Sequence, residues 1–244
     1  MTYPDYPDQP GRNTVLRPET APEWLRPLTE TPDTEAIRRT LGVKPGVRPR
    51  PDKQAAVLML FAGARDATAL PADAGVLLTH RAPTMRTHSG QMAFPGGRID
   101  ATDDNVVDTA LREAWEETGL RRDSVTPIAQ LPEMHVRSNG YPVHPIIAYW
   151  DEPEELYPAS EEETDDVFTA SIEELADPAS RLTVGWGPWR GPAFQVRGYV
   201  VWGFTGGLLA SALATAGWED EWDRDTVHDL STVLAASRNN ESMD

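Results

Sequence analysis

Cysteine is absent from the 244 residues, and its absence excludes several kinds of chemistry. Without thiols the chain cannot form disulfides, use a thiolate nucleophile or hold a metal through sulfur. Basic residues are also few, because 22 lysines and arginines face 39 aspartates and glutamates, a formal net charge of −17. Proteins that bind nucleic acid or anionic membranes usually present a basic face, so neither partner is expected. A small phosphorylated substrate is compatible with this charge, since screening over about 8 Å lets a few arginines and metal ions set the local field.

Export signals are lacking as well. The first residues, MTYPDYPDQPGRNTV, have no basic start followed by an apolar run, so we expect a cytoplasmic protein. The uncharged stretch at residues 198–218 is long enough to be considered as a membrane span. Glycines and hydroxyl side chains interrupt it, which favours a strand that ends near Trp202 and a buried helix over about 205–216.

Short apolar runs around one helical pattern predict a layered domain of mixed α and β structure. The expected strands are Ala55–Phe61, Gly75–Thr79, Gln91–Phe94, Ser124–Met134, Val143–Trp150 and Val167–Ser171. The main helix is expected over about 105–119, where Gly119 ends it, and a short one in SIEELAD, residues 171–177.

Both ends of the chain differ in composition from this domain. Residues 1–50 are rich in proline and charge, and we expect an extension with a short helix at about 32–41 and a proline-rich linker at 44–51. The domain itself is assigned to residues 51–217. Residues 218–244 are expected to form an acidic tail that is helical over about 223–237.

The helix at about 105–119 concentrates carboxylates on one side. Glu113, Glu116 and Glu117 lie within about 100° of one another, as an exposed ridge opposite the apolar face. That apolar face should pack on a core and comprises Val107, Ala110, Leu111 and Ala114. Each pair of like charges three or four positions apart destabilises an isolated helix by about 0.2–0.5 kcal/mol. A cation bound between the carboxylates would turn this repulsion into a net attraction. Carboxylate ligands suit Mg²⁺ or Mn²⁺ better than zinc or copper. The alternative to a metal site is a solvated acidic face of the helix.

The segment REAWEETGL, residues 112–120, resembles the signature box of the Nudix hydrolases. In that pattern a glycine, five residues, a glutamate and seven residues precede R-E-U-x-E-E-x-G-U, where U is apolar. The second half matches position by position. The first half departs from the pattern, because Asp103 stands where the family has glutamate and eight residues separate it from Arg112.

The longer loop resembles that of one branch of the family, the coenzyme A pyrophosphatases. Their second signature is a stretch like LLTxR, an arginine five residues further on, and then G-x-x-x-F-P-G-G. The chain has LLTHRAPTMRTHSGQMAFPGG at residues 77–97, which matches this signature and includes Arg81 and Arg86. The resemblance spans roughly residues 54–215 and leaves the first fifty residues and the acidic tail outside it.

The resemblance implies a fold, a cofactor and a set of catalytic residues. The fold would be a Nudix-type α/β/α sandwich, an α+β architecture with a mixed β-sheet between helices. Glu113 and Glu117 would hold Mg²⁺ or Mn²⁺, with Glu116 as a further ligand. One of them, or an acid from a later loop, would act as general base on the attacking water. Arg112 would pair with a glutamate to hold the ligand geometry.

Substrate binding would fall to Arg81, Arg86, Gly96 and Gly97. The fork of an arginine suits phosphate oxygens, and glycine lets the backbone approach a metal or phosphate closely. Two surface arginines and a tight turn before a helix are the plainer alternatives. The reaction implied is divalent-metal-dependent hydrolysis of the pyrophosphate bond of coenzyme A or its derivatives. Its products are phosphopantetheine, or acyl-phosphopantetheine, and 3′,5′-ADP.

Other readings use the same residues. The substrate could be another nucleoside diphosphate derivative, such as a dinucleotide or a sugar nucleotide, or the chain could be a catalytically silent nucleotide-sensing module. Isopentenyl diphosphate isomerase, a relative on the same fold, is disfavoured because its chemistry employs a cysteine. The five histidines have no metal-ligand spacing. Residues 151–166 read as a solvated acidic loop, and one of its carboxylates could reach the site as a further ligand or base.

Overall fold

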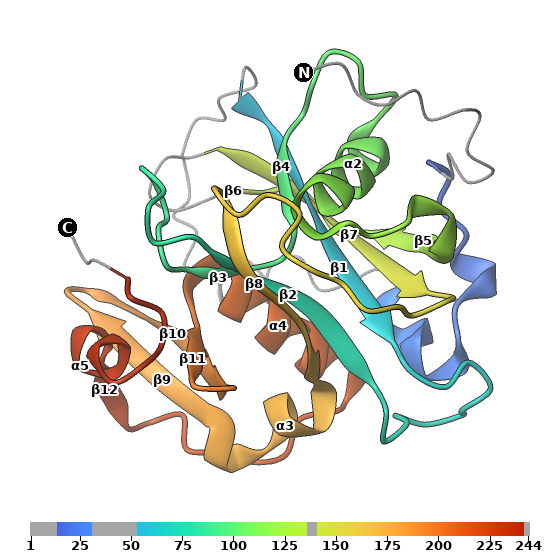
Figure 1. The fold of residues 1–244 in the computed structure, drawn as a ribbon. Coiled ribbons are helices and arrows are strands. Elements are labelled where there is room, and N and C mark those ends of the chain that lie inside the picture. The colour runs from blue at the N-terminus through green and yellow to red at the C-terminus, as the bar shows by residue number, and fades with distance from the viewer. Residues whose placement is uncertain (1–13, 31–52, 136–140, 242–244) are drawn as a thin grey trace.

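The computed structural model describes residues 14–30, 53–135 and 141–241, and strand β1 (Ala55–Ala62) runs through its centre (Figure 1). Successive residues of β1 belong to two different cores. Ala56, Leu58 and Leu60 pack with helix α2 (Val106–Thr118), whereas Met59 and Phe61 lie in the core that includes helix α4 (Gly203–Ala216). A strand covered on both faces needs apolar side chains throughout, which explains the continuous run AAVLMLF.

The central sheet is mixed. β1 pairs in parallel with β7 (Pro142–Trp150) and antiparallel with β2 (Gly75–Arg81). The sheet order is β3-β2-β1-β7-β5, with β4 paired to β1, β6 to β7 and β8 to β2. These strands are β3 (Met92–Ala93), β4 (Gly96–Arg98), β5 (Val125–Gln130), β6 (Met134–His135) and β8 (Thr164–Ser171). Helices α2 and α4 cover opposite faces, so the predicted α+β fold with a mixed sheet between helices is confirmed (Figure 1).

A second, four-stranded sheet was not predicted. Its order is β11-β10-β9-β12, and it comprises β9 (Arg181–Trp186), β10 (Trp189–Val196), β11 (Tyr199–Val201) and β12 (Val227–Asp229). β12 pairs in parallel with β9, far away in sequence, and helix α5 (Leu230–Ala235) follows it. The helix expected over about 223–237 is therefore shorter and begins after a strand. Minor elements are α3 (Ile172–Ala176) and the 3₁₀ turns Arg122–Ser124 and Pro178–Ser180.

Helix α2 is bounded by the residues that its sequence suggests. The Asn105 side chain accepts hydrogen bonds from the N–H groups of Val107 and Asp108, which satisfies two of the first-turn donors. At the other end Gly119 adopts a left-handed conformation with φ of 71° and its N–H closes on Trp115 O. The predicted helix is confirmed, and its position is fixed at both ends.

Residues 14–30 pack against the domain through two 3₁₀ segments, Pro18–Thr20 and Glu23–Leu28. Trp24 is 3% exposed, its indole N–H donates to Ala64 O at 3.1 Å, and its ring lies 5.6 Å from that of Trp218. The packed domain therefore includes residues before the predicted boundary at 51 and residues after the predicted boundary at 217. The predicted helix at 32–41 and the linker at 44–51 lie outside the described residues.

The uncharged stretch near residue 200 forms β11 and α4, as predicted. Leu208, Leu209 and Leu213 of α4 lie in the core beside β1. Among the described residues, no helix combines the length and the apolar character needed to cross a bilayer.

Replacing Trp24 by alanine tests whether the N-terminal segment belongs to the folded domain. Because the indole is buried, we expect Trp24→Ala to lower the free energy of unfolding by about 3–5 kcal/mol in urea denaturation. Trp186 is 52% exposed and provides the matched control, for which Trp186→Ala should change stability by less than about 0.5 kcal/mol. Equal stability of Trp24→Ala and wild type would show that the segment does not stabilise the domain.

Candidate active site

Two glycines bring strand β4 close to both β1 and α2. A Cβ on Gly96, whose φ is 158°, would lie 2.7 Å from Val57 Cα and overlap the Ala56 carbonyl oxygen. A Cβ on Gly97 would overlap the carboxyl group of Glu113. Glycine is required at both positions because the backbone must approach its neighbours more closely than a side chain allows. The sequence predicted a close approach to a metal or phosphate, whereas the close contacts in the structure are with β1 and the Glu113 carboxyl group.

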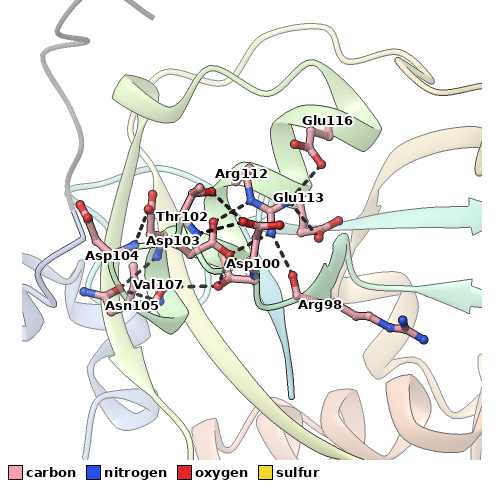
Figure 2. Close-up of polar contacts among 12 residues, drawn as sticks. Arg98, Asp100, Thr102, Asp103, Asp104, Asn105, Val107, Arg112, Glu113 and Glu116 are labelled. Atoms are coloured by element: carbon pink, nitrogen blue, oxygen red, sulfur yellow. Dashed lines mark hydrogen bonds and ion pairs between the residues drawn. The ribbon is translucent and has the colours of Figure 1, made fainter. Parts of the chain in front are cut away.

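The loop between β4 and α2 is organised around Asp103, whose side chain is only 2% exposed. Its two carboxylate oxygens accept hydrogen bonds from Arg112 Nε at 2.7 Å and Nη2 at 2.9 Å (Figure 2). The Thr109 hydroxyl and the Asp100 N–H each donate to Oδ2 at 2.8 Å. Burial by itself raises the pKa of Asp103, but these hydrogen bonds and the Arg112 charge outweigh it and hold the pKa below its ordinary value.

Arg112 extends its remaining donors to the helix carboxylates. Nη1 donates to Glu113 Oε1 at 3.0 Å and to Glu116 Oε2 at 3.1 Å, while Nη2 also donates to Arg98 O at 2.9 Å (Figure 2). One guanidinium group thus fixes the loop on one side and two glutamates on the other. The pairing of Arg112 with glutamate that the sequence suggested is present, and the loop aspartate is its strongest partner.

Glu117 is buried, which corrects the expectation of an exposed ridge of three glutamates. Its residue exposure is 4%, because β4 and the end of β2 cover this side of the helix. Oε2 accepts a hydrogen bond from Gly96 N–H at 3.1 Å, and Oε1 lies 3.9 Å from Arg81 Nη1. Glu113 and Glu116 are more accessible, with 15% and 28% of their side chains exposed. The helical period places the three on one side but does not show what packs over them.

Burial dominates the electrostatics of the two inner glutamates. It raises the pKa of Glu117 to about 8, since Arg81 and the Gly96 N–H only partly compensate, and the Glu113 and Glu163 charges raise it further. Burial likewise raises the pKa of Glu113, although Arg112 opposes this shift. Near neutral pH the metal-free site therefore favours a protonated Glu117, because its ionised form would be a buried carboxylate that Arg81 only partly neutralises.

A divalent cation fits this arrangement. Glu116 Oε1 is buried without a hydrogen-bond partner among the described residues, and the Glu113 carboxyl group lies directly against the Gly97 backbone. The donors are all oxygens, as Mg²⁺ and Mn²⁺ prefer. In the described part of the chain no three acidic or imidazole groups are already gathered as a metal cluster, because the Arg112 guanidinium lies between Glu113 and Glu116.

The two predicted substrate arginines occupy different positions. Arg81 ends β2 beside Glu117, and its buried Nε has no hydrogen-bond partner within the described residues. Its backbone closes the following loop, since Arg81 O accepts from Gly90 N–H at 2.9 Å and Arg81 N–H donates to Gln91 O at 3.0 Å. Arg86 is exposed within that loop. The structure therefore brings Arg81 to the glutamates. Arg86 lies at the surface, in the loop that follows Arg81.

Within the acidic loop at residues 151–166, Glu163 lies near the helix glutamates. Its carbonyl oxygen accepts from Ala82 N–H at 2.9 Å, which fixes it beside the end of β2. Its charge acts on both Glu113 and Glu117, and its side chain is exposed. The sequence suggested that one acid of this loop reaches the site but did not identify which one. The only local signal is its place immediately before β8.

Known proteins with similar sequences show the family to which the chain belongs. A NUDIX domain model matches residues 49–187. A protein called uncharacterized Nudix hydrolase NudL from Escherichia fergusonii is 38% identical over 145 residues, covering 55% of this chain and 71% of its own. The protein of the same name from Cronobacter sakazakii is 37% identical over 147 residues, with the same coverage. The crystal structure of RenU, a Nudix hydrolase from M. smegmatis, superposes with a TM-score of 0.48 and 20% identity over 72% of this chain and 92% of that one.

The Asp103 to Arg112 pair is expected to be essential for the stability of the loop. Asp103→Asn keeps the shape of the side chain but leaves the Arg112 charge without its bidentate partner, so we expect a loss of about 3 kcal/mol in urea denaturation. Asp123 is exposed, and Asp123→Asn should stay within about 0.5 kcal/mol of wild type. A loss no larger than that of the control would contradict a structural role for the pair.

The raised pKa of Glu117 makes the metal-free protein sensitive to pH. Unfolding releases the carboxyl proton above its ordinary pKa of 4.5, whereas the folded protein retains it up to about 8. The contribution of this group to stability is therefore complete below about 4.5 and is lost as the pH rises through 8.

Thermal melts from pH 5 to 9 in a chelator test this expectation. Glu117→Gln should lack this loss, so its Tm should exceed that of wild type by an increasing amount toward alkaline pH, and Mg²⁺ should stabilise only the wild type. Glu162→Gln, at an exposed position, is the control. If the Glu117→Gln and wild-type curves run parallel, Glu117 does not titrate in this range.

Proposed function

Because the chain belongs to the Nudix hydrolase family, we propose that it hydrolyses the pyrophosphate bond of coenzyme A or its derivatives with Mg²⁺ or Mn²⁺. The products are phosphopantetheine, or its acyl form, and 3′,5′-ADP. Pyrophosphohydrolysis is the activity of the family, and the choice of coenzyme A is the further step. The observation that carries it is the position of Arg81, which joins the stretch at residues 77–97 to the carboxylate helix at a distance of 3.9 Å from Glu117.

Glu113, Glu116 and Glu117 are the residues that would hold the metal. When bound there, a divalent cation supplies Lewis acidity to the phosphate oxygens and lowers the pKa of water. Arg112 keeps Glu113 and Glu116 in place through Nη1, at 3.0 and 3.1 Å, while its bonds to Asp103 prevent it from moving with them. Gly96 N–H holds Glu117 Oε2, so Glu117 is oriented by the backbone of β4 while Glu113 and Glu116 share Arg112.

The proton of the attacking water needs a carboxylate that is not already committed. Glu163 meets this requirement, since its side chain is exposed and close enough to Glu113 and Glu117 to shift the pKa of each. Glu113 and Glu116 share Arg112, and Glu117 is buried. We therefore assign the general base to Glu163 and the ligand roles to the helix glutamates.

The negative charge of the substrate is met by arginines. Arg81 has a buried Nε that lacks a partner in the described parts of the chain, and a phosphate oxygen would satisfy it. Arg86, exposed in the following loop, is available for the outer phosphates of coenzyme A, which carries a 3′-phosphate in addition to its pyrophosphate. The pair of arginines thus suits a substrate with more than one phosphate group.

Glu113→Gln is expected to reduce kcat for coenzyme A by at least about 100-fold, because an amide is a poor ligand for Mg²⁺ and binds Arg112 differently. Product analysis by chromatography should detect 3′,5′-ADP with wild type in Mg²⁺ or Mn²⁺ and almost none with the variant. Glu162→Gln, one residue from the proposed base and exposed, should retain wild-type turnover. Undiminished turnover in Glu113→Gln would refute the mechanism.

The same assay distinguishes the substrates. The kcat/KM for coenzyme A is expected to exceed that for a dinucleotide and for a sugar nucleotide measured under the same conditions. A higher value for either compound would replace coenzyme A as the substrate while leaving the chemistry intact. Binding of all three without hydrolysis would identify a sensing module in place of an enzyme.

A further inference from the structure

The end of the described chain returns to the loop that carries the substrate arginines. After α5, Asn239 and Glu241 lie against the base of the loop that begins at Arg81 and ends at Gln91. We call these two residues the C-terminal clasp, and Arg81, Gly90 and Gln91 the neck of the loop. The clasp lies beyond residues 49–187, which the family model covers.

Asn239 is completely buried and pairs with β11 in the manner of a strand backbone. Its Oδ1 accepts from Val200 N–H at 2.8 Å and its Nδ2 donates to Val200 O at 3.0 Å. Its own carbonyl oxygen lies 3.0 Å from His80 Nε2. Asn239 therefore joins the second sheet to β2, one residue before Arg81.

Glu241 binds the neck directly. Oε1 accepts from Gln91 Nε2 at 2.6 Å, and Oε2 accepts from Trp202 Nε1 at 2.9 Å. Both carboxylate oxygens are thus used, one on the loop and one on the residue that precedes α4. Hydrogen bonds to a carboxylate are stronger than those between neutral groups, so this contact is a firm tie between the tail and the loop.

The approach at Gly90 is too close for any other residue. A Cβ there would overlap the Asn239 carbonyl oxygen and lie 2.9 Å from Glu241 Cα, and the φ of Gly90 is 73°. Gly90 in turn donates its N–H to Arg81 O at 2.9 Å. The tail backbone thus packs on the residue that closes the loop onto Arg81.

His80 extends the clasp into the central sheet. Its Nδ1 pairs with Asp165 of β8, its Nε2 faces Gly90 O at 3.2 Å in addition to the Asn239 carbonyl, and its ring lies 4.7 Å from that of Tyr199. The side chain is 2% exposed. Displacement of the tail would therefore loosen His80 and the adjacent Arg81 together.

We propose that Asn239 and Glu241 are positioning residues that hold the neck of the loop, and with it Arg81 and Arg86, in place for binding an anionic substrate. Their hydrogen bonds reach the side chains of His80 and Gln91, at the two ends of the loop, and their backbone packs on Gly90. Among the contacts of the described residues, none joins either residue to the helix glutamates. The clasp should consequently affect the affinity for phosphate groups and leave the chemical step unchanged. The substrate part of this proposal rests on the proposed function, and the ordering of the loop does not.

Glu241→Ala is the test, because it removes both hydrogen bonds and keeps the buried Asn239. Hydrogen exchange measured by mass spectrometry should become about tenfold faster in peptides covering residues 82–91, while α2 exchanges as in wild type. Calorimetry with inorganic pyrophosphate in Mg²⁺ should show affinity about five- to tenfold weaker. With coenzyme A, KM should rise by a similar factor and kcat should stay within about twofold.

Two further variants complete the experiment. Glu221→Ala, an exposed glutamate earlier in the same C-terminal stretch, should match wild type in every measurement. Glu241→Gln should restore most of the affinity, because an amide can accept from Trp202 and donate to a reoriented Gln91 side chain. Burial raises the pKa of Glu241, which also indicates that an uncharged side chain is tolerated there.

Each other outcome overturns a defined part of the proposal. Wild-type exchange at residues 82–91 in Glu241→Ala would show that the clasp does not hold the loop. Faster exchange with unchanged pyrophosphate affinity, or no pyrophosphate binding by wild type, would show that the loop does not serve anion binding. Equal losses in kcat and kcat/KM would assign Glu241 to the chemical step. Failure of wild type to hydrolyse coenzyme A would reject that substrate alone, since the exchange and pyrophosphate measurements do not use it.

Discussion

The site depends on the hydrogen bonds and ion pairs of Arg112. Its guanidinium group binds Asp103 through two nitrogens and presents the third to Glu113 and Glu116. A single positive charge therefore faces three carboxylates, and Glu117, whose pKa is raised to about 8, lies nearby. A buried pair of this kind contributes little net stability, because desolvation offsets most of the attraction, but it determines where the carboxylates lie. A divalent cation bound beside these carboxylates would supply the positive charge that the single guanidinium does not.

The burial of Glu117 lowers the stability of the metal-free protein. A carboxyl group that packs under β4 and the end of β2 would be more stable if it were replaced by a neutral side chain, as its raised pKa indicates. The two glycines of β4 increase this cost of desolvation, because they let the backbone approach the carboxyl groups closely in place of water. Such a site lowers the stability of the metal-free protein and increases the affinity for a metal, because the same uncompensated charge underlies both effects.

The sequence predicted the parts of the structure that local chemistry determines. The end of α2 at Gly119 and the strand β1 were predicted from residues close together in the chain. The burial of Glu117 was missed because it depends on a strand that packs over the helix. Glu163 could not be singled out within an acidic loop for the same reason, since its position is set by pairing of the loop with Ala82.

The role of Asp103 illustrates how a departure from a family pattern can be resolved by structure. Aspartate is shorter than glutamate by one methylene group, and the loop that carries it has one extra residue before Arg112. In this chain the longer loop brings Asp103 to the Arg112 guanidinium, where Thr109 and the Asp100 backbone complete its hydrogen bonds. By contrast, the second sheet and the C-terminal tail have no local pattern that predicts their partners. The candidate catalytic residues thus lie within a short stretch of sequence, whereas the loop proposed to bind the substrate is held by contacts between distant parts of the chain.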